Sequence, residues 1–414
     1  MTSWKEYKLD DIAEIHNKKR VPLSSQVRSK RSGKFPYYGA SGIVDYIDDY
    51  IFDGEFVLIS EDGENLRSRN TPIAFKAKGK FWVNNHSHIV KGKKNYLNDW
   101  IIYYFKNLDI NPYITGAVQP KLNKENLLSI PFRMPDFKTV EQIAEILSSL
   151  DDKIELNNKI NQELENLAQT IFKQWFIDFE FPDENGNPYK SSSGEMVDSE
   201  LGEIPKGWEV ERLGDHLYIK GRIGWKGLKK SEYLQEFKGY SIVNGSDFLN
   251  EQIDYSTCGW ISKERYDDSP EIQLRKNDIL ITKDGTIGKL AFVSKIEHPT
   301  SVASGVFVVR SNSKKVSTFF CWSFFKSPYF QHLVKSRIDG SVIPHLYQKD
   351  FVEMFIPLPP ISLLQVYESQ AKSIFEMIFE NKEESKELGK LRDSLLPKLI
   401  SGELEVAEIL SEKI

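Results

Sequence analysis

Two stretches of the chain carry seam residues at alternating intervals of three and four positions, the spacing of a helix that packs lengthwise against another helix. The first seam runs through Ile143, Leu147, Leu150, Ile154, Asn157, Asn161, Leu164, Ala168, Ile171 and Trp175. The second runs through Tyr367, Ala371, Ile374, Ile378, Asn381, Ser385 and Leu388. We predict one long helix within 137–180 and another within 361–414, and we expect the second to loosen near Arg392 and to kink or end at Pro397.

Both seams are polar in the middle, at Asn157 and Asn161 in the first and at Asn381 and Ser385 in the second. A buried Asn in such a seam weakens packing but selects register and partner. A helix of roughly 33 residues is about 50 Å long, more than one small domain covers. We therefore predict that the two helices pack as an antiparallel coiled coil; the alternative is that each packs on its own domain.

The segments before the helices, 1–136 and 206–360, show a different pattern. Apolar runs at 56–59, 278–282 and 305–309 predict strands, and the Asp-Gly pairs that begin at Asp62 and Asp284 predict turns. The apolar stretches 100–105 and 319–325 predict short buried helices. The fold class is therefore α+β: two tandem mixed α/β domains separated by two long helices. The Pro-, Gly- and Ser-rich stretch 181–205 predicts a linker between the first helix and the second domain.

The chain repeats itself in order. Trp4 and Leu9 recur 204 positions later as Trp208 and Leu213, and residues 58–63 recur 222 positions later as 280–285. Further landmarks recur at an offset of 224, which both seams share: Gly116, Pro120 and Leu122 become Gly340, Pro344 and Leu346. A common order with a slowly drifting offset indicates a duplicated unit, and hence a pseudo-two-fold internal repeat.

Charge modifies this picture. The net charge is −5, which argues against a simple nucleic-acid binder. Yet 16–34 contains seven basic residues and 220–230 contains five, both without an acid, whereas the acids gather in 178–203. Two basic stretches at matching places in a repeat favour phosphate contacts over merely solvated surfaces.

Other features bound the class of protein. Two cysteines cannot form a disulfide framework or a metal cage, and they suit a reducing compartment. The first residues do not resemble a signal peptide, and no apolar run is long enough to span a bilayer. We expect a soluble, cytoplasmic protein.

Catalytic motifs are missing from the sequence. It contains no Gly-x-Gly-x-x-Gly and no phosphate-binding loop. Asn111-Pro112-Tyr113 lacks the second proline of an adenine methyltransferase motif, so we interpret it as a turn. His86 and His88 would share one face of a strand, but without a third ligand we interpret them as ordinary polar side chains. We therefore predict no catalytic residue, no metal site and no cofactor bound by this chain.

Five strings of the sequence are distinctive: Gly202-Glu203-Ile204-Pro205-Lys206-Gly207-Trp208, which is the most specific, and those at 175–182, 35–43, 283–289 and 395–404. Through them the chain resembles type I restriction–modification specificity subunits over essentially its whole length. The resemblance implies a non-catalytic, DNA-binding subunit with two target recognition domains, 1–136 and 206–360. Each reads one half of a split, asymmetric site in double-stranded DNA.

The resemblance also implies partners. The long helices, 137–180 and 361–414, would act as a spacer and as the docking surface for two methyltransferase subunits, which restriction motor-nuclease subunits join. S-adenosylmethionine, ATP and Mg²⁺ would be held by those partners. The unequal lengths of the two domains suggest that the two half-sites differ.

Basic loops would position each domain on phosphates and polar side chains would read base edges. In the first domain the predicted DNA contacts are Lys18, Lys19, Arg20, Arg28, Tyr38, Ser41, Arg67, Arg69, Gln119 and Lys121. In the second they are Arg222, Lys226, Lys229, Asn244, Ser246, Lys283, Thr286, Arg337 and His345. Two other functions remain open: a single-chain DNA endonuclease with an unrecognised active site, and a coiled-coil scaffold with no role on DNA.

Overall fold

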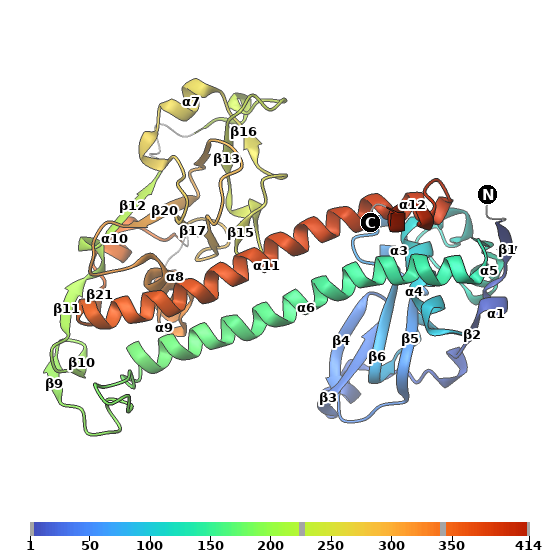
Figure 1. The fold of residues 1–414 in the computed structure, drawn as a ribbon, viewed down its shortest axis with the longest axis horizontal. Helices are drawn as coiled ribbons and strands as arrows, with labels where there is room; N and C mark the ends of the chain where they lie inside the picture. The colour runs from blue at the N-terminus through green and yellow to red at the C-terminus, as the bar shows by residue number, and fades with distance from the viewer. Residues whose placement is uncertain (1–3, 223–227, 340–344, 412–414) are drawn as a thin grey trace. The chain divides into compact units, whose positions relative to one another are not determined.

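The computed structural model describes residues 4–222, 228–339 and 345–411. The chain divides into two compact units: unit 1 contains Met1–Asn157 and Glu383–Ile414, and unit 2 contains Asn158–Lys382. Both boundaries fall inside the two long helices, α6 (Phe137–Phe176) and α11 (Ile361–Ser401). Each unit therefore consists of a globular α/β part and one half of each long helix (Figure 1).

Unit 1 is built on a six-stranded sheet with the order β2-β7-β5-β6-β3-β4, in which β3 and β6 are parallel and the other neighbours are antiparallel. The helix α4 (Asn95–Asn107) packs on one face (Figure 1). The strands are β2 (Ala13–Ile15), β3 (Ser32–Gly39), β4 (Gly42–Ile47), β5 (Phe52–Ser60), β6 (Ala74–Val83) and β7 (Ser87–Gly92).

Strand β5 shows why this sheet is buried on both faces. Val57 and Ile59 enter the core shared with α4, α6 and α11, whereas Phe56 and Leu58 enter an aromatic core on the opposite face. Side chains alternate between the faces of a strand, so the continuous apolar run 56–59 supplies both cores. The prediction of a strand here is confirmed.

Unit 2 has a four-stranded sheet with the order β12-β20-β17-β18 and a smaller three-stranded sheet with the order β16-β13-β19. In β17, Ile279 and Ile281 face the core that contains the long helices, and Leu280 faces the other core. The strands are β12 (Leu217–Gly221), β13 (Ser241–Val243), β16 (Gly259–Trp260), β17 (Ile279–Thr282), β18 (Leu290–Phe292), β19 (Thr300–Val302) and β20 (Val306–Ser311).

The two units share several elements at matching places of the repeat, although their sheets differ. Leu58 and Leu280, the matching residues of the repeat, lie in β5 and β17 and point away from the long helices in both units. A short antiparallel pair precedes each long helix: β1 (Lys5–Tyr7) with β8 (Phe132–Met134), and β11 (Glu209–Arg212) with β21 (Phe355–Leu358). The predicted buried helices are α4 and α8 (Thr318–Lys326), in which Trp100 and Trp322 are fully buried.

The halves of the long helices pack antiparallel in both units. In unit 1, Val140, Ile143 and Leu147 of α6 share a core with Leu396, Leu399 and Ile400 of α11. In unit 2, Ala168, Phe172 and Trp175 share a core with Tyr367, Ala371 and Phe375. As residue numbers increase along α6, those of the contacting residues in α11 decrease, so the two helices are antiparallel. The predicted mixed fold with paired long helices is confirmed.

The predicted seam residues lie at this contact. All of them are buried or half-buried, and the polar ones meet: Asn157 Nδ2 donates to Ser385 Oγ at 3.3 Å, and Asn381 Nδ2 donates to Asn161 Oδ1 at 2.9 Å.

Two expectations need correction. The helix α11 does not end at Pro397 but continues to Ser401, because Leu396, Leu399 and Ile400 are buried on both sides of the proline. The stretch 181–205, predicted as a linker, contains regular structure, because it forms the hairpin β9 (Met196–Ser199) and β10 (Gly202–Pro205). Phe181 and Ile204 enter the same core as Trp208.

Candidate nucleic-acid interface

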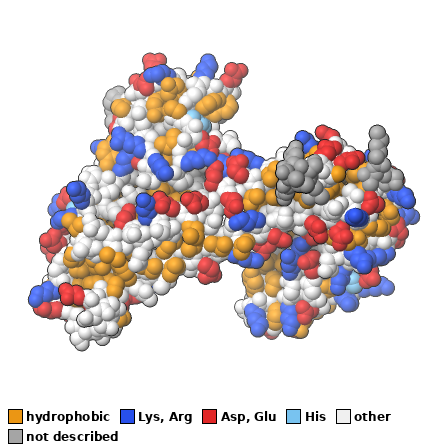
Figure 2. All heavy atoms as spheres, in the orientation of Figure 1, with side chains coloured by type: hydrophobic (Ala, Val, Ile, Leu, Met, Phe, Trp, Pro, Cys, Tyr) orange, Lys and Arg blue, Asp and Glu red, His pale blue; other side chains and the backbone are white. Residues whose placement is uncertain are grey.

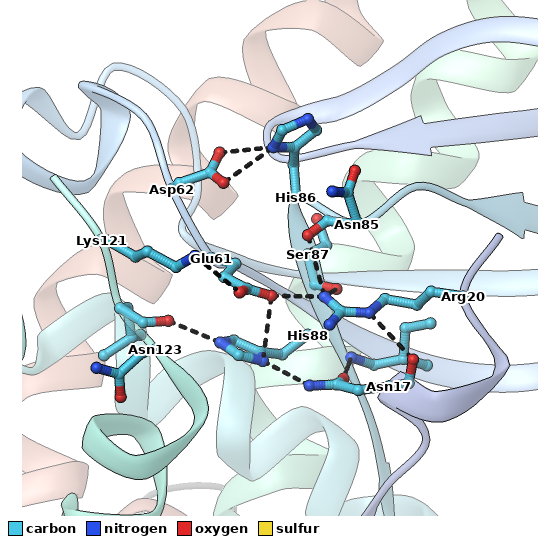
Figure 3. A network of polar contacts seen from close by, with 12 residues as sticks. Asn17, Arg20, Glu61, Asp62, Asn85, His86, Ser87, His88, Lys121 and Asn123 are labelled. Carbon is cyan, nitrogen blue, oxygen red and sulfur yellow. Dashed lines mark hydrogen bonds and ion pairs between the residues drawn. The ribbon is translucent and has the colours of Figure 1, made fainter. Parts of the chain in front are cut away.

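In unit 1, loops from separate parts of the chain meet where β5 ends and β7 begins. Leu122 N donates to Glu61 O at 2.8 Å, and Gly63 N donates to Pro120 O at 3.1 Å. The hydroxyl of Ser60 donates to Ala40 O at 2.5 Å, which brings the turn between β3 and β4 to the same place. We call this group of segments, 17–20, 40–41, 61–69, 84–87 and 115–122, the unit 1 loop cluster (Figure 3).

Unit 2 joins the matching segments by the same bond. Leu346 N donates to Lys283 O at 3.2 Å, as Leu122 does to Glu61 in unit 1. Lys283 N in turn donates to Gly305 O at 2.9 Å, and Lys289 Nζ donates to Gly245 O at 3.2 Å. The segments 244–247, 282–289, 303–305 and 345–347 form the unit 2 loop cluster. Two landmarks that recur far apart in the sequence are therefore hydrogen-bonded neighbours in both units.

Arg20 is the residue that holds the unit 1 loop cluster together. Its guanidinium donates to Glu61 Oε2 at 2.5 Å, to Asn85 O at 3.1 Å and to Ser87 O at 2.9 Å (Figure 3). Burial alone would raise the pKa of the Glu61 carboxyl, but the hydrogen bond from Arg20 and the nearby positive charges lower it overall. Arg20, predicted to contact DNA, is instead bound within the protein through its Nε and Nη1 atoms.

His88 is a structural histidine at the centre of the same network. Asn17 Oδ1 accepts from Ile89 N at 2.9 Å, so its Nδ2 donates to His88 Nδ1 at 2.8 Å. The other ring nitrogen, Nε2, therefore carries the proton and donates to Leu122 O at 2.7 Å. Burial lowers the pKa of His88, in keeping with this neutral form. Within the part of the chain that the structure describes, no group of three or more His, Cys, Asp or Glu side chains is placed to hold a metal ion.

Besides Arg67 and Arg69, which bond to the backbone of the fold, five of the ten predicted contacts of the first domain are exposed in the unit 1 loop cluster. Lys121 also forms an ion pair with Glu61 at 3.5 Å. These five are Lys18, Lys19, Ser41, Gln119 and Lys121.

The other predicted contacts in unit 1 make bonds within the fold. Arg67 and Arg69 are exposed, but they donate to the backbone oxygens of residues 116–117 and of Leu108. Tyr38 is half-buried against Phe75 and Phe81, and its burial raises the pKa of its hydroxyl.

Arg28 is bound on the side of β4. It pairs with Asp45 at 3.0 Å and lies over the Tyr37 ring at 4.9 Å. On the face shown in Figure 2, Lys and Arg side chains gather over the part of unit 1 that holds β3, β4 and β6.

In unit 2 the loop cluster gathers five of the nine predicted contacts: Asn244, Ser246, Lys283, Thr286 and His345. Lys229 is exposed on a separate segment. Lys226 and the side chain of Arg337 lie outside the described residues.

Arg222 does not face solvent. It is 3% exposed, and its guanidinium donates to Val302 O at 3.1 Å and to Ser301 Oγ at 2.9 Å. It therefore serves the folding of unit 2 and is not placed to reach a phosphate.

The structure adds one pairing that the sequence interpretation missed. Asp62 accepts from His86 Nδ1 at 2.9 Å, and Asp284, its counterpart in the repeat, pairs with His345 Nδ1 (Figure 3 for unit 1). The repeated Asp-Gly pair was the available signal. The histidines could not be paired with it from sequence because they come from different loops in the two units.

The unit 1 loop cluster thus presents exposed basic and polar side chains, and the unit 2 loop cluster presents exposed Ser246 and Thr286 beside the half-buried Lys283. Basic and polar side chains on a hydrogen-bonded backbone are suited to contacts with a polyanion. The described residues include no helix long and apolar enough to cross a membrane.

Comparisons with known proteins identify the family that the chain is similar to. A family model described as the type I restriction modification DNA specificity domain matches residues 1–166 and 205–377. The type I restriction enzyme MjaIX specificity subunit of Methanocaldococcus jannaschii is 27% identical, over 98% of this chain and 94% of its own length. A putative type I restriction enzyme specificity subunit of Haemophilus influenzae is 29% identical, over 90% of this chain and 89% of its own length.

The fold has a counterpart among solved structures. The crystal structure of a type I restriction–modification system S subunit from M. genitalium superposes with a TM-score of 0.64 at 16% identity, covering 96% of both chains.

Proposed function

The chain belongs to the type I restriction–modification DNA specificity family, and from that membership we propose that it reads a DNA site made of two different half-sites, one with each unit. Specificity subunits are the non-catalytic components of such systems. The proposal makes this chain the part that selects the sequence, while chemistry takes place on partner subunits.

One observation carries the proposal: both units bring their repeated landmarks together into a loop cluster of the same construction. Leu122 bonds to Glu61 and Leu346 bonds to Lys283, and exposed basic or polar side chains surround both bonds. A duplicated scaffold with different side chains at its tips is what two related domains need to read different sequences. In unit 1 the tips offer Lys18 and Lys121, and in unit 2 they offer Lys283 and Asn244.

The long helices supply the spacing in this proposal. The helix α6 has 40 residues and α11 has 41, which corresponds to about 60 Å of helix each. Two half-sites on one face of B-DNA are about 34 Å apart for one helical turn, which is within that length. We further propose that the exposed faces of these helices dock two methyltransferase subunits, which restriction subunits join. S-adenosylmethionine, ATP and Mg²⁺ then belong to those partners.

Basic and polar side chains would have different roles in binding the DNA site. Lys18, Lys19 and Lys121 would bind phosphates and set the register on the duplex, since phosphate contacts carry no sequence information. Ser41, Gln119 and Asn244 have donors and acceptors that can match base edges in the major groove.

An exchange of one domain tests the proposal. Residues 1–136 are replaced by the matching domain of another family member, and methylated adenines are mapped by sequencing in cells that carry the complete system. We expect one half of the methylated site to change while the other half and the spacing stay the same. A change in both halves together would contradict modular reading.

Two further results would favour the other functions. Cleavage of DNA by the purified chain with Mg²⁺ alone would favour an endonuclease. Methylation that is unchanged when the gene is deleted would favour a scaffold with no role on DNA.

A further inference from the structure

A half-buried group of charges joins the globular part of unit 2 to both long helices. Lys326, at the end of α8, forms ion pairs with Glu165 of α6 and, at 2.9 Å, with Glu251. Glu251 also lies 3.6 Å from Lys382 of α11. The side chain of Lys326 is only 9% exposed, and that of Glu165 14%. We call Glu165, Glu251, Lys326 and Lys382 the unit 2 ion cluster.

Glu251 reaches this cluster through an unusual turn. It lies with Asn250 between the short strands β14 (Phe248–Leu249) and β15 (Gln252–Ile253), and both turn residues have left-handed backbones, with φ of 49° and 62°. Asparagine tolerates such a backbone, but a residue such as Glu251 is disfavoured there unless its surroundings hold it. Here Lys382 Nζ donates to Asn250 O at 3.0 Å, and Phe292 N donates to Glu251 O at 2.9 Å. The turn is therefore held against α11.

Unit 1 has a polar group in the corresponding place. Tyr103 of α4 donates to Asp151 of α6 at 2.7 Å, and Lys106 of α4 binds Asp393 of α11 at 2.5 Å. Arg392 of α11 completes the group through an ion pair with Asp151. We call these five residues the unit 1 polar cluster. In both units, then, polar side chains of the globular part bond both α6 and α11.

The two clusters are not copies inherited from the duplication. At the offset of 224 that the long helices share, Asp151 matches Phe375, and Glu165 matches Gly389. Arg392 likewise matches Ala168. The same connection has therefore been built twice from different residues, whereas the apolar packing around it follows the repeat. This separate construction points to a requirement of function rather than to common ancestry.

We propose that the unit 1 polar cluster and the unit 2 ion cluster position the two recognition domains on the helix pair, so that DNA with a half-site spacing one base pair too long or too short is rejected. The inference rests on the proposed function and deepens it. Its residues do not touch DNA; they act through the angle that each domain makes with α6 and α11.

Charged contacts at a junction restrict movement in a way that apolar contacts do not. Removing ionised groups from water is unfavourable, and apolar residues of similar size often give equal or greater stability than a buried ion pair. An ion pair with fixed hydrogen bonds, however, tolerates little sliding or rotation, whereas aliphatic contacts can shift against one another. Charges kept at the junction between domain and helix are therefore suited to holding an angle.

The test compares two variants of unit 2 in the complex with the methyltransferase partner. Glu165→Met with Lys326→Met removes both ion pairs of Lys326 from the junction and leaves Glu251 paired with Lys382. The control, Arg310→Met with Asp278→Asn, breaks a buried ion pair inside the globular part that touches neither long helix. Dissociation constants are measured for duplexes that carry the mapped methylation site with its natural spacer, and with spacers one base pair shorter and longer.

We expect the wild-type complex and the control to prefer the natural spacer by the same factor. In the junction variant the preference falls by about tenfold, in the range that one misplaced recognition element produces. Tyr103→Phe, which removes a single hydroxyl from the unit 1 polar cluster, should shift the preference in the same direction and provides the test if the double variant does not fold.

The possible outcomes separate the two levels of inference. Retention of the full preference by the junction variant and by Tyr103→Phe would overturn the positioning role while leaving the proposed function intact. Equal losses in the junction and control variants would overturn it as well, because general destabilisation would then explain the effect. A wild-type complex with no preference for any bipartite duplex would contradict the proposed function itself.

Discussion

Asn157 of α6 donates a hydrogen bond to Ser385 of α11 at 3.3 Å, and their repeat counterparts Asn381 and Asn161 are hydrogen-bonded at 2.9 Å. The first bond lies in unit 1 and the second in unit 2. Polar pairs thus interrupt an otherwise apolar seam at matching positions of the duplicated sequence. Because an unpaired amide in a seam is unfavourable, these pairs select the register in which α6 meets α11.

Replacing one polar pair with leucines tests this role. For Asn161→Leu with Asn381→Leu, we expect the free energy of unfolding to stay the same or to rise by about 1 kcal/mol, because both partners become apolar together. The register should become less exact, so methylation should appear at additional spacer lengths. The checks are thermal unfolding and mapping of methylated adenines. The exposed neighbour Asn158→Leu is the control, and a similar broadening there would argue against register selection.

The sequence anticipated much of this arrangement because its signals are periodic or repeated. The heptad spacing predicted both long helices, and the apolar runs at 56–59 and 278–282 predicted β5 and β17. The recurring landmarks marked segments that turn out to be hydrogen-bonded. All these signals depend on local pattern or on comparing the chain with itself.

Individual contacts were harder to predict because a basic residue looks the same in the sequence whether it is buried or exposed. Arg222 stands in a run of basic residues, yet it is enclosed by oxygens of Val302 and Ser301, which lie far along the chain. Arg20 likewise binds Glu61, a partner that lies far from it along the chain. The pairing of Asp62 with His86 likewise depends on two loops whose approach no local pattern encodes.

Lengthening the helices should change the spacing of the half-sites. Seven residues inserted into α6, with seven into α11 at the facing position, keep the seam in phase and add about 10 Å of helix. We expect the unread spacer in the methylated site to grow by about three base pairs, since B-DNA rises about 3.4 Å per pair. An insertion into α6 alone should change the spacer or abolish assembly. Unchanged spacing with normal methylation in either variant would contradict the role of the helices as a spacer.

Glu61 should make the stability of unit 1 sensitive to acid. Burial opposes its charge, but Arg20 and neighbouring cations lower its pKa below the ordinary value of 4.5. The contribution of its charge to the free energy of unfolding is therefore complete above pH 4.5 and is lost as the pH falls through the lowered folded-state pKa.

For Glu61→Gln we expect the free energy of unfolding to fall by about 1–3 kcal/mol at pH 7, because Arg20 loses a charged partner. The difference from wild type should shrink towards pH 3, as denaturant unfolding at both pH values would show; a constant difference would contradict this assignment.

Comparing Lys18 and Lys19 with Arg222 should distinguish basic residues that contact DNA from a basic residue that stabilises the fold. The lysines are exposed on the short helical turn Asn17–Lys19, whereas Arg222 is buried. Lys18→Ala with Lys19→Ala should leave unfolding unchanged and weaken DNA binding alike for all sequences. If both lysines contact phosphates, the slope of log K against log salt should fall by up to about 2.

Arg222→Met should instead destabilise unit 2 by about 2 kcal/mol, since backbone and hydroxyl acceptors would remain buried without a donor. Titrations of duplex DNA at several salt concentrations, with thermal unfolding, distinguish the two; an unchanged salt slope in the lysine variant would remove 17–20 from the interface.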